Sequence, residues 1–234
     1  MPGVRSSTSN RNRTICDPSL PRAGMLIAFD FDGTLSDSEM TVLLGEEAGV
    51  ADEIDDITER AMNDELSYAE SLYARAELLD GLESSAVDAA FNRVALRPGS
   101  ADVIEALSEA GHHVAILTGG FEQGVERALE TEGVSVDTVV ANRLPARNGT
   151  LTGDAEGPLI EGTKDDALAD LADEVGVSMD DTVAIGDGAN DLPMLEVAGL
   201  AVGYEPKPAV EPHCDTVVAS MAELLDLLEA KAVL

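Results

Sequence analysis

From Met25 to the C-terminus, short apolar runs alternate with segments of helical period, and this alternation restricts the possible fold more than any other sequence feature. The runs are rich in Val, Ile and Ala and are bounded by Gly, Asp or Asn, as is typical of buried parallel strands. The expected strands are residues 26–31, 114–118, 138–141, 182–186, 200–202 and 216–218. The expected helices are residues 101–110, 121–131, 164–175, 191–198 and 221–230. This order predicts an α/β fold with a doubly wound, parallel, Rossmann-like sheet.

Two segments interrupt the alternation. Residues 36–97 contain helical patterns at 39–47, 52–63, 68–79 and 85–94 and no strand pattern. They predict a small helical cap domain, inserted after the first strand and lying over the carboxyl edge of the sheet. The core domain then comprises residues 25–35 and 98–234. Between Leu144 and Leu151, Asn148-Gly149 is a two-residue turn signal and predicts a β-hairpin flap.

Residues 1–24 differ in composition from the rest of the chain, with four arginines, one acidic residue and no apolar periodicity. We expect them to form a disordered tail, with Met25 as an alternative start. Cys16 lies in this tail, far from Cys214, so no disulfide framework is expected. No apolar stretch approaches 18 residues and the N-terminus lacks the apolar run of a secretory signal, which excludes a membrane span and favours the cytoplasm.

The chain is strongly acidic, with 46 Asp and Glu against 14 Lys and Arg and a formal net charge of -32. Its lysines are Lys164, Lys207 and Lys231. Such a field repels nucleic acid. The long apolar periodic segments argue against a disordered acidic chain, which leaves a solvated acidic surface or adaptation to molar salt. The scarcity of lysine favours a halophilic protein, because salt at about 1 M reduces the Debye length to roughly 3 Å.

Residues able to carry chemistry stand where the predicted strands end, and ligands bind at that edge of open parallel sheets. Asp30 and Asp32 follow the first run and precede Gly33, an arrangement that a solvated turn would also explain. Thr118 follows the second run, and with Gly119 it forms either an anion cradle or a plain strand-to-helix turn.

Two more carboxylates, Asp187 and Asp191, follow the run at 182–186. An N-cap would explain one of these acids but not both. Lys164 stands at the start of a predicted helix, where either a functional cation or a salt-bridged surface lysine is possible. Together these residues form an ordered set that is hard to obtain by accident: D-x-D-G-T, T-G-G, a lysine, and G-D-G-x-x-D.

This set resembles the four motifs of the haloacid dehalogenase-like superfamily of phosphotransferases over nearly all of residues 25–230. Four further segments resemble its phosphoserine phosphatase branch: Gly119-Gly120-Phe121, Ala141-Asn142-Arg143, Leu151-Thr152-Gly153-Asp154 and Gly186-Asp187-Gly188-Ala189-Asn190-Asp191. Gly33 and Thr118 depart from that branch, which usually has Ser at both positions. These departures weaken the prediction of the substrate rather than that of the reaction.

The resemblance implies a Mg²⁺-dependent phosphomonoesterase that hydrolyses O-phospho-L-serine, the last step of serine biosynthesis. It makes Asp30 the nucleophile, which becomes an aspartyl phosphate, and Asp32 the general acid and base. Asp30, the main-chain carbonyl of Asp32 and the side chain of Asp187 would hold the metal. Asp191 would lie in its outer shell or orient Lys164.

The resemblance also assigns residues to substrate binding. Thr118 and the Gly119 amide would bind the transferring phosphoryl group, and Lys164 would neutralise charge on Asp30 and the phosphate. Asn190 would support this arrangement.

Within the cap, Glu39 would bind the substrate ammonium and Arg75 its carboxylate. A helix N-terminal acid and a solvated Arg are the alternative interpretations. Met62 and Tyr68 are predicted apolar contacts to the substrate, with core packing equally plausible. No role is assigned to His112 or His113.

The expected partner is thus a small phosphorylated amino acid, with no nucleic acid and no membrane, and the oligomeric state stays open. Three alternatives remain at this stage. The chain could pass the phosphoryl group to another hydroxyl, such as that of homoserine. It could hydrolyse a different small monoester. It could also be a non-enzymatic module that binds phosphate or metal, although four chemically competent motifs argue against that.

Overall fold

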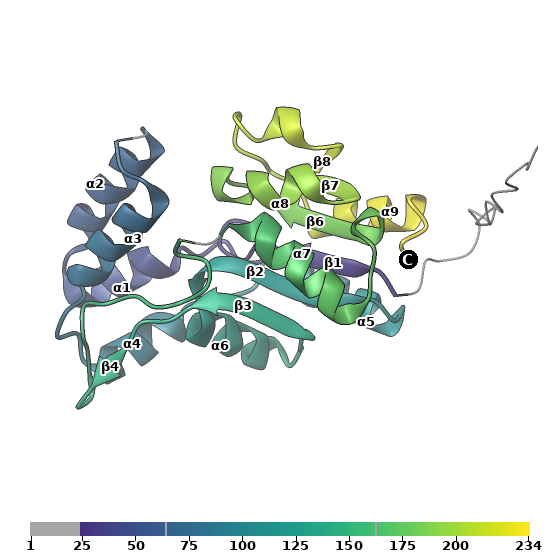
Figure 1. Cartoon of the computed structure of the whole chain (residues 1–234). Coiled ribbons are helices and arrows are strands. Elements are labelled where there is room, and N and C mark those ends of the chain that lie inside the picture. The colour runs from purple at the N-terminus through teal and green to yellow at the C-terminus, as the bar shows by residue number, and fades with distance from the viewer. Residues whose placement is uncertain (1–23, 64, 162) are drawn as a thin grey trace, which may run out of the picture.

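The computed structural model describes residues 24–63, 65–161 and 163–234 (Figure 1). The predicted tail at 1–24 lies outside this part of the chain except for Gly24, and so does Cys16. The core is a six-stranded sheet in the order β3-β2-β1-β6-β7-β8, with every neighbouring pair parallel. Its strands are β1 (Leu26–Phe29), β2 (His113–Phe121), β3 (Thr138–Asn142), β6 (Thr182–Gly186), β7 (Leu200–Tyr204) and β8 (Thr216–Val218). The predicted α/β sheet is confirmed.

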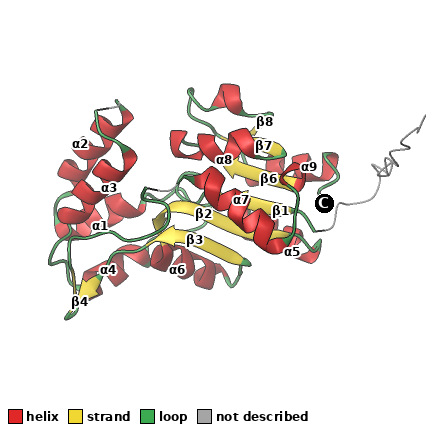
Figure 2. Ribbon diagram, in the orientation of Figure 1, coloured by secondary structure: helices red, strands yellow, loops and turns green. Residues whose placement is uncertain are grey.

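Helices cover both faces of this sheet (Figure 2). They are α5 (Ser100–Glu109), α6 (Glu122–Glu132), α7 (Lys164–Val175), α8 (Leu192–Val197) and α9 (Met221–Ala230). Side chains of β1 alternate between two cores, as the two-residue period of a strand requires. Ile27 and Phe29 belong to the core shared with α5, α6 and α9, whereas Leu26 and Ala28 face α7 and α8. The sheet is therefore doubly wound.

Several strand ends differ from the prediction, and β7, for example, ends at Tyr204 rather than at residue 202. β1 ends at Phe29 rather than at residue 31, because the chain turns as soon as the Asp30 N–H has bonded to the Ile185 carbonyl oxygen at 2.8 Å. β2 extends three residues further than predicted, to Phe121, which pairs with Asn142 of β3 after a register shift. The helix expected at 191–198 begins at Leu192, after a short 3₁₀ turn over Ala189–Asp191. Cross-strand pairing, invisible in local periodicity, decides the boundaries of the strands.

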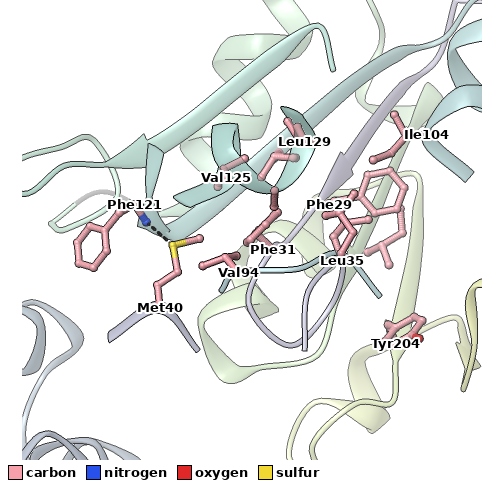
Figure 3. Packing of buried hydrophobic residues seen from close by; sticks show 14 of the residues in the cluster. Phe29, Phe31, Leu35, Met40, Val94, Ile104, Phe121, Val125, Leu129 and Tyr204 are labelled. Atoms are coloured by element: carbon pink, nitrogen blue, oxygen red, sulfur yellow. Dashed lines mark hydrogen bonds between the residues drawn. The ribbon is translucent and has the colours of Figure 1, made fainter. Parts of the chain in front are cut away.

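Four helices lie between β1 and α5, where the sequence predicts a helical insert. They are α1 (Met40–Ala48), α2 (Ala51–Met62), α3 (Tyr68–Glu77) and α4 (Ser84–Phe91). In Figure 1, α1, α2 and α3 stand beyond the carboxyl ends of the strands, whereas α4 lies beside α6. At their junction with the core, the Phe121 N–H lies 3.3 Å from the Met40 sulfur, within a cluster that includes Phe31 (Figure 3). Apolar packing thus joins α1 to the sheet edge.

The predicted hairpin is also present, as β4 (Ala146–Arg147) and β5 (Thr150–Leu151). Asn148 and Gly149 both have positive φ angles, 55° and 87°, which a two-residue turn of this kind requires. The hairpin is bonded to the α3–α4 connection, since the Leu151 N–H donates to the Leu82 carbonyl and the Gly81 N–H donates to that of Leu151. The flap therefore rests on the helical insert. Within the described ranges, no helix has the length and apolar character that a bilayer crossing needs.

Many acidic residues are exposed on the surface. Helix α2 is one example, with five exposed acidic side chains: Asp52, Glu53, Asp55, Asp56 and Glu59. Because these charges repel one another in dilute buffer, we expect the melting temperature to rise by roughly 10 °C between about 0.01 M and 2 M KCl. Thermal unfolding followed by circular dichroism measures this. Sucrose at equal osmolality is the control for effects other than screening. A melting temperature that stays flat across the KCl series contradicts the halophilic interpretation.

Candidate active site

The carboxyl ends of β1, β2 and β6 converge on one cavity of about 120 Å³. The cap closes its other side. The residues that line it are Asp30, Asp32, Glu39, Thr41, Tyr68, Leu72, Arg75, Thr118, Gly119, Gly120, Asp187, Asn190 and Lys207. Predicted site residues from the core and from the cap thus meet in one place, although they come from distant parts of the sequence.

Lys164 lies beneath this cavity as a buried cation. Its ammonium contacts Asp30 Oδ1 and Asp191 Oδ1, both at 2.5 Å, and all three side chains are almost fully inaccessible to solvent. The two carboxylates raise the pKa of Lys164 well above its ordinary range despite the opposing effect of burial. Lys164 therefore stays charged, and the alternative of a surface lysine is wrong.

Asp191 is held from its other side as well. Its Oδ2 accepts hydrogen bonds from the backbone N–H groups of Asp187 (3.0 Å) and Gly188 (2.9 Å). Asn190, which is exposed at the cavity rim, directs its amide toward Asp191 Oδ1 at 3.4 Å. With one oxygen on Lys164 and the other on two amides, Asp191 orients the lysine and the turn that follows β6.

The two aspartates after β1 differ in their surroundings. Burial and the charge of Asp191 raise the pKa of Asp30 to about 7, although Lys164 opposes this shift. Burial, followed by the charges of Glu39 and Asp30, holds the pKa of Asp32 well above its ordinary value. Asp32 Oδ1 is buried without a hydrogen-bond partner among the described residues. The site thus favours an ionisable Asp30 beside a protonated Asp32, as a nucleophile and an acid require.

A divalent cation fits the donor set at this edge. Carboxylate oxygens of Asp30, Asp187 and Asp191 lie within 4.8 Å of one another, and oxygen donors are what Mg²⁺ prefers. Gly33 makes room for one of them, since a Cβ there would stand 2.6 Å from Asp187 Oδ1 and its φ is +90°. Gly33 therefore allows the close approach of Asp187 in this chain.

The end of β2 provides hydrogen-bonding groups on the opposite wall. Thr118 is buried, and its Oγ1 accepts the Gly120 N–H at 2.9 Å. Because that oxygen already accepts a bond, its own proton is available to a group in the cavity. Helix α6 begins directly after this strand, so its N-terminal end faces the same region. The arrangement suits a phosphoryl group.

Helix α3 carries two of the predicted cap residues. A capping box between Ser67 and Glu70 begins the helix at Tyr68, which places Tyr68 and Arg75 two turns apart on one face. Arg75 Nη1 donates to Thr41 Oγ1 at 3.1 Å and its Nε donates to the Ser71 carbonyl at 3.2 Å. Arg75 is therefore held in place by the cap itself, with its charge toward the cavity.

The other cap predictions have different outcomes. Glu39 precedes α1 and lines the cavity, where burial raises the pKa of its carboxyl. Tyr68 lines it too, but its hydroxyl donates to the Gly119 carbonyl at 2.9 Å, so the contact is polar as well as apolar. The side chain of Met62 lies outside the described residues, and its predicted role is untested.

The sequence interpretation missed Lys207, which follows β7. Its ammonium lies 3.2 Å from Asp187 Oδ2, and its backbone N–H donates to the backbone carbonyl of Asp187 at 2.9 Å. Pairing with this lysine opposes the rise that burial causes in the pKa of Asp187. The scarcity of lysine was the available signal, because two of the three lysines in the chain stand at this site.

Comparison with known proteins gives consistent matches. The model of the haloacid dehalogenase-like hydrolase family matches residues 27–196. A phosphoserine phosphatase of Halobacterium salinarum is 53% identical over 204 residues, which is 87% of this chain and 97% of that protein. One of Methanocaldococcus jannaschii is 38% identical over 194 residues, 82% of this chain and 91% of the other.

Solved structures give the same result. A phospho-aspartyl intermediate analogue of phosphoserine phosphatase has a TM-score of 0.81 and 36% identity, covering 88% of this chain and 99% of the other. A substrate-bound phosphoserine phosphatase complex has a TM-score of 0.81 and 35% identity over the same shares. Fold and sequence therefore agree along almost the whole described chain.

Proposed function

The chain belongs to the haloacid dehalogenase-like hydrolases, and from that premise we propose that it hydrolyses O-phospho-L-serine to L-serine and phosphate with Mg²⁺. The observation that carries this proposal is the shared cavity. Asp30 stands on its floor, with Lys164 bonded behind it, whereas Glu39 and Arg75, of opposite charge, line the same cavity on the cap side. A phosphate at the floor and a zwitterionic amino acid toward the cap match this distribution of charge.

The chemistry begins at Asp30. Its carboxylate attacks phosphorus, and an Asp30–phosphorus bond forms while the bond from phosphorus to the seryl oxygen breaks. The raised pKa of Asp32 keeps that side chain protonated, so it donates the proton that the leaving seryl oxygen needs. Asp32, now a carboxylate, takes a proton from a water whose oxygen bonds to phosphorus while the Asp30–phosphorus bond breaks, and phosphate is released. Asp30 is then free for the next cycle.

Charge compensation makes this attack of one anion on another possible. Lys164 neutralises Asp30 from below, at 2.5 Å, and the Thr118 hydroxyl and the Gly119 amide would bind the phosphoryl oxygens. Asp30, Asp187 and the carbonyl of Asp32 would hold Mg²⁺, with Asp191 behind Lys164. The bound metal would supply further positive charge to the phosphoryl oxygens.

Recognition of the amino-acid end falls to the cap. Glu39 would accept the substrate ammonium and Arg75 would donate to its carboxylate. Asn190 and Tyr68 complete the rim of the cavity. The partner of the proposed enzyme is a small phosphorylated amino acid, and the cytoplasmic location expected from the sequence stays a prediction.

Arg75→Met tests the substrate. Losing a charge-assisted hydrogen bond to the carboxylate costs about 1.5–3 kcal/mol, so kcat/KM for L-phosphoserine should fall by about one to two orders of magnitude. Glu39→Gln should also lower kcat/KM for L-phosphoserine, because it removes the negative charge that would bind the substrate ammonium. Hydrolysis of p-nitrophenyl phosphate, which has neither group, should barely change. Phosphate release in the presence of Mg²⁺ measures both substrates.

Arg93→Met is the matched control, because Arg93 pairs with Glu46 on the outer surface and does not line the cavity. Equal losses on both substrates would mean that Arg75 supports the phosphoryl site instead. A wild-type enzyme indifferent to L-phosphoserine would contradict the proposed substrate. Product analysis with added homoserine separates hydrolysis from phosphoryl transfer.

A further inference from the structure

The carbonyl oxygen of Gly119 accepts two side-chain hydrogen bonds, one from the core and one from the cap. Asn142 Nδ2 donates at 3.0 Å, and the Tyr68 hydroxyl donates at 2.9 Å. Asn142 ends β3, whereas Tyr68 begins α3. The Gly119–Gly120 peptide is therefore held from both sides of the cavity, by elements that have no other role in the proposed phosphoryl chemistry.

This peptide also contacts the Thr118 hydroxyl. Its N–H, which belongs to Gly120, donates to Thr118 Oγ1 at 2.9 Å. Because a peptide unit is planar, fixing its carbonyl also fixes the direction of its N–H. A rotation of the carbonyl away from Asn142 and Tyr68 would withdraw the N–H from Thr118. The two side-chain donors thus act on Thr118 through one rigid group.

Asn142 is fixed in a single orientation. It is fully buried, and its Oδ1 accepts the N–H of Leu159 at 3.0 Å while its Nδ2 serves Gly119. A flipped amide would place a donor against the Leu159 N–H and an acceptor against the Gly119 carbonyl, and both bonds would be lost. Leu159 precedes Lys164 by five residues in the chain. Asn142 therefore connects the Thr118 wall with the segment that leads to Lys164.

Tyr68, which donates to the Gly119 carbonyl, belongs to the cap. Burial raises the pKa of its hydroxyl to about 12, so it keeps its proton throughout the neutral range. The fit is close, since a Cβ on residue 119 would collide with the hydroxyl, and a larger residue there would require Tyr68 to move. Because α3 belongs to the insert, its hydrogen bond to Gly119 exists while the cap lies over the cavity.

We propose that Asn142 and Tyr68 are positioning residues that clamp the Gly119–Gly120 peptide, Asn142 from the core and Tyr68 from the closed cap, and thereby align the Thr118 hydroxyl with the phosphoryl group. The inference rests on the proposed function only for the reaction that the clamp serves. It gives the cap a second task beside recognition: its closure completes the wall on which the phosphoryl group is held.

Tyr68→Phe tests the cap side, because it removes one hydroxyl and keeps the ring. We expect kcat to fall about fivefold on L-phosphoserine and on p-nitrophenyl phosphate, with KM changed less than twofold and the melting temperature unchanged. The Gly120 amide resonance in a ¹H–¹⁵N NMR spectrum should shift. Tyr73→Phe, on the exposed side of the same helix, is the control. Unchanged kcat and an unchanged Gly120 resonance in Tyr68→Phe overturn the proposal.

Asn142→Asp tests the core side of the clamp. The variant keeps an acceptor for the Leu159 N–H, but a carboxylate oxygen replaces the amide group that donates to the Gly119 carbonyl. We expect a loss in kcat of about 10- to 100-fold, by comparison with the removal of one direct donor to a reacting oxygen. If both residues hold one peptide, the two losses should not multiply, and the double variant should lose little more than Asn142→Asp alone. A loss of kcat in the double variant that lies within about twofold of the product of the single losses would mean independent sites and would contradict the clamp.

The arms of this experiment separate two kinds of failure. Wild-type activity on p-nitrophenyl phosphate without activity on L-phosphoserine counts against the proposed substrate, and the double-mutant cycle on the aryl ester still judges the clamp. The Gly120 resonance needs no turnover at all. If Asn142→Asp fails to fold, the kinetic and NMR measurements on Tyr68→Phe alone decide whether the clamp exists.

Discussion

Asp30→Asn is expected to abolish turnover while the protein stays folded. The substitution keeps the size of the side chain but removes the anionic oxygen that would attack phosphorus, and no Ser, Cys or His among the described residues stands in its place on the cavity wall. Lys164 keeps its second partner, Asp191, at 2.5 Å, so a buried unpaired cation is not created. We expect kcat to fall by more than about 10³-fold.

Phosphate release from L-phosphoserine and from p-nitrophenyl phosphate measures this loss, and circular dichroism establishes the fold. Asp226→Asn, on the exposed face of α9, is the matched control and should keep wild-type activity. Beryllium fluoride with Mg²⁺ should inhibit the wild-type enzyme as a mimic of the aspartyl phosphate. A folded Asp30→Asn variant that retains even a tenth of the activity rules out Asp30 as the nucleophile.

Lys164→Met should have the largest effect on stability together with a severe loss of activity. The ammonium lies between two buried carboxylates, and its removal leaves Asp30 and Asp191 facing each other without a cation. Breaking a buried ion pair from one side costs about 3–5 kcal/mol. The free energy of unfolding, measured by urea denaturation at fixed molar salt, should fall by that amount. Turnover should fall by at least about 10³-fold because charge compensation at the nucleophile is lost.

Lys231→Met is the control for this prediction, since it makes the same chemical change at an exposed position after α9. Its unfolding free energy should stay within about 0.5 kcal/mol of wild type. Were Lys164→Met as stable as this control, the buried triad would not contribute to the native state as described.

The periodic elements were predictable because their signal is local. The bounds of β6, β8, α7 and α9 match the expected ranges, since Gly, Asp or Ser bounds each of these segments and one period runs through it. The end of β1 and the extension of β2 were not predictable, because hydrogen bonds to β6 and β3 decide them. Local periodicity carries no information about such pairing.

The core of the site followed from the ordering of its motifs, because carboxyl ends of parallel strands must meet at one edge. The geometry accordingly brings Asp30, Asp187 and Asp191 together. Lys207 was missed because it stands in a loop without periodicity and reaches Asp187 only through the fold. The hydrogen bond from the Tyr68 hydroxyl to Gly119 was also missed, because its acceptor is a backbone carbonyl, which no sequence pattern marks.

The long separation between the members of the buried triad has a consequence for biosynthesis. Asp30 emerges early from the ribosome, but its contact with Lys164 spans 134 residues, and β1 pairs with β6 still later in the chain. The helices of the insert instead contact near neighbours in sequence, α1 with α2 and α2 with α3. Folding must therefore wait for long-range closure of the sheet around its central strand, which is slow compared with local helix packing. A nascent or truncated chain that ends before β6 carries the nucleophile but cannot assemble the site, and phosphoryl chemistry is confined to the finished protein.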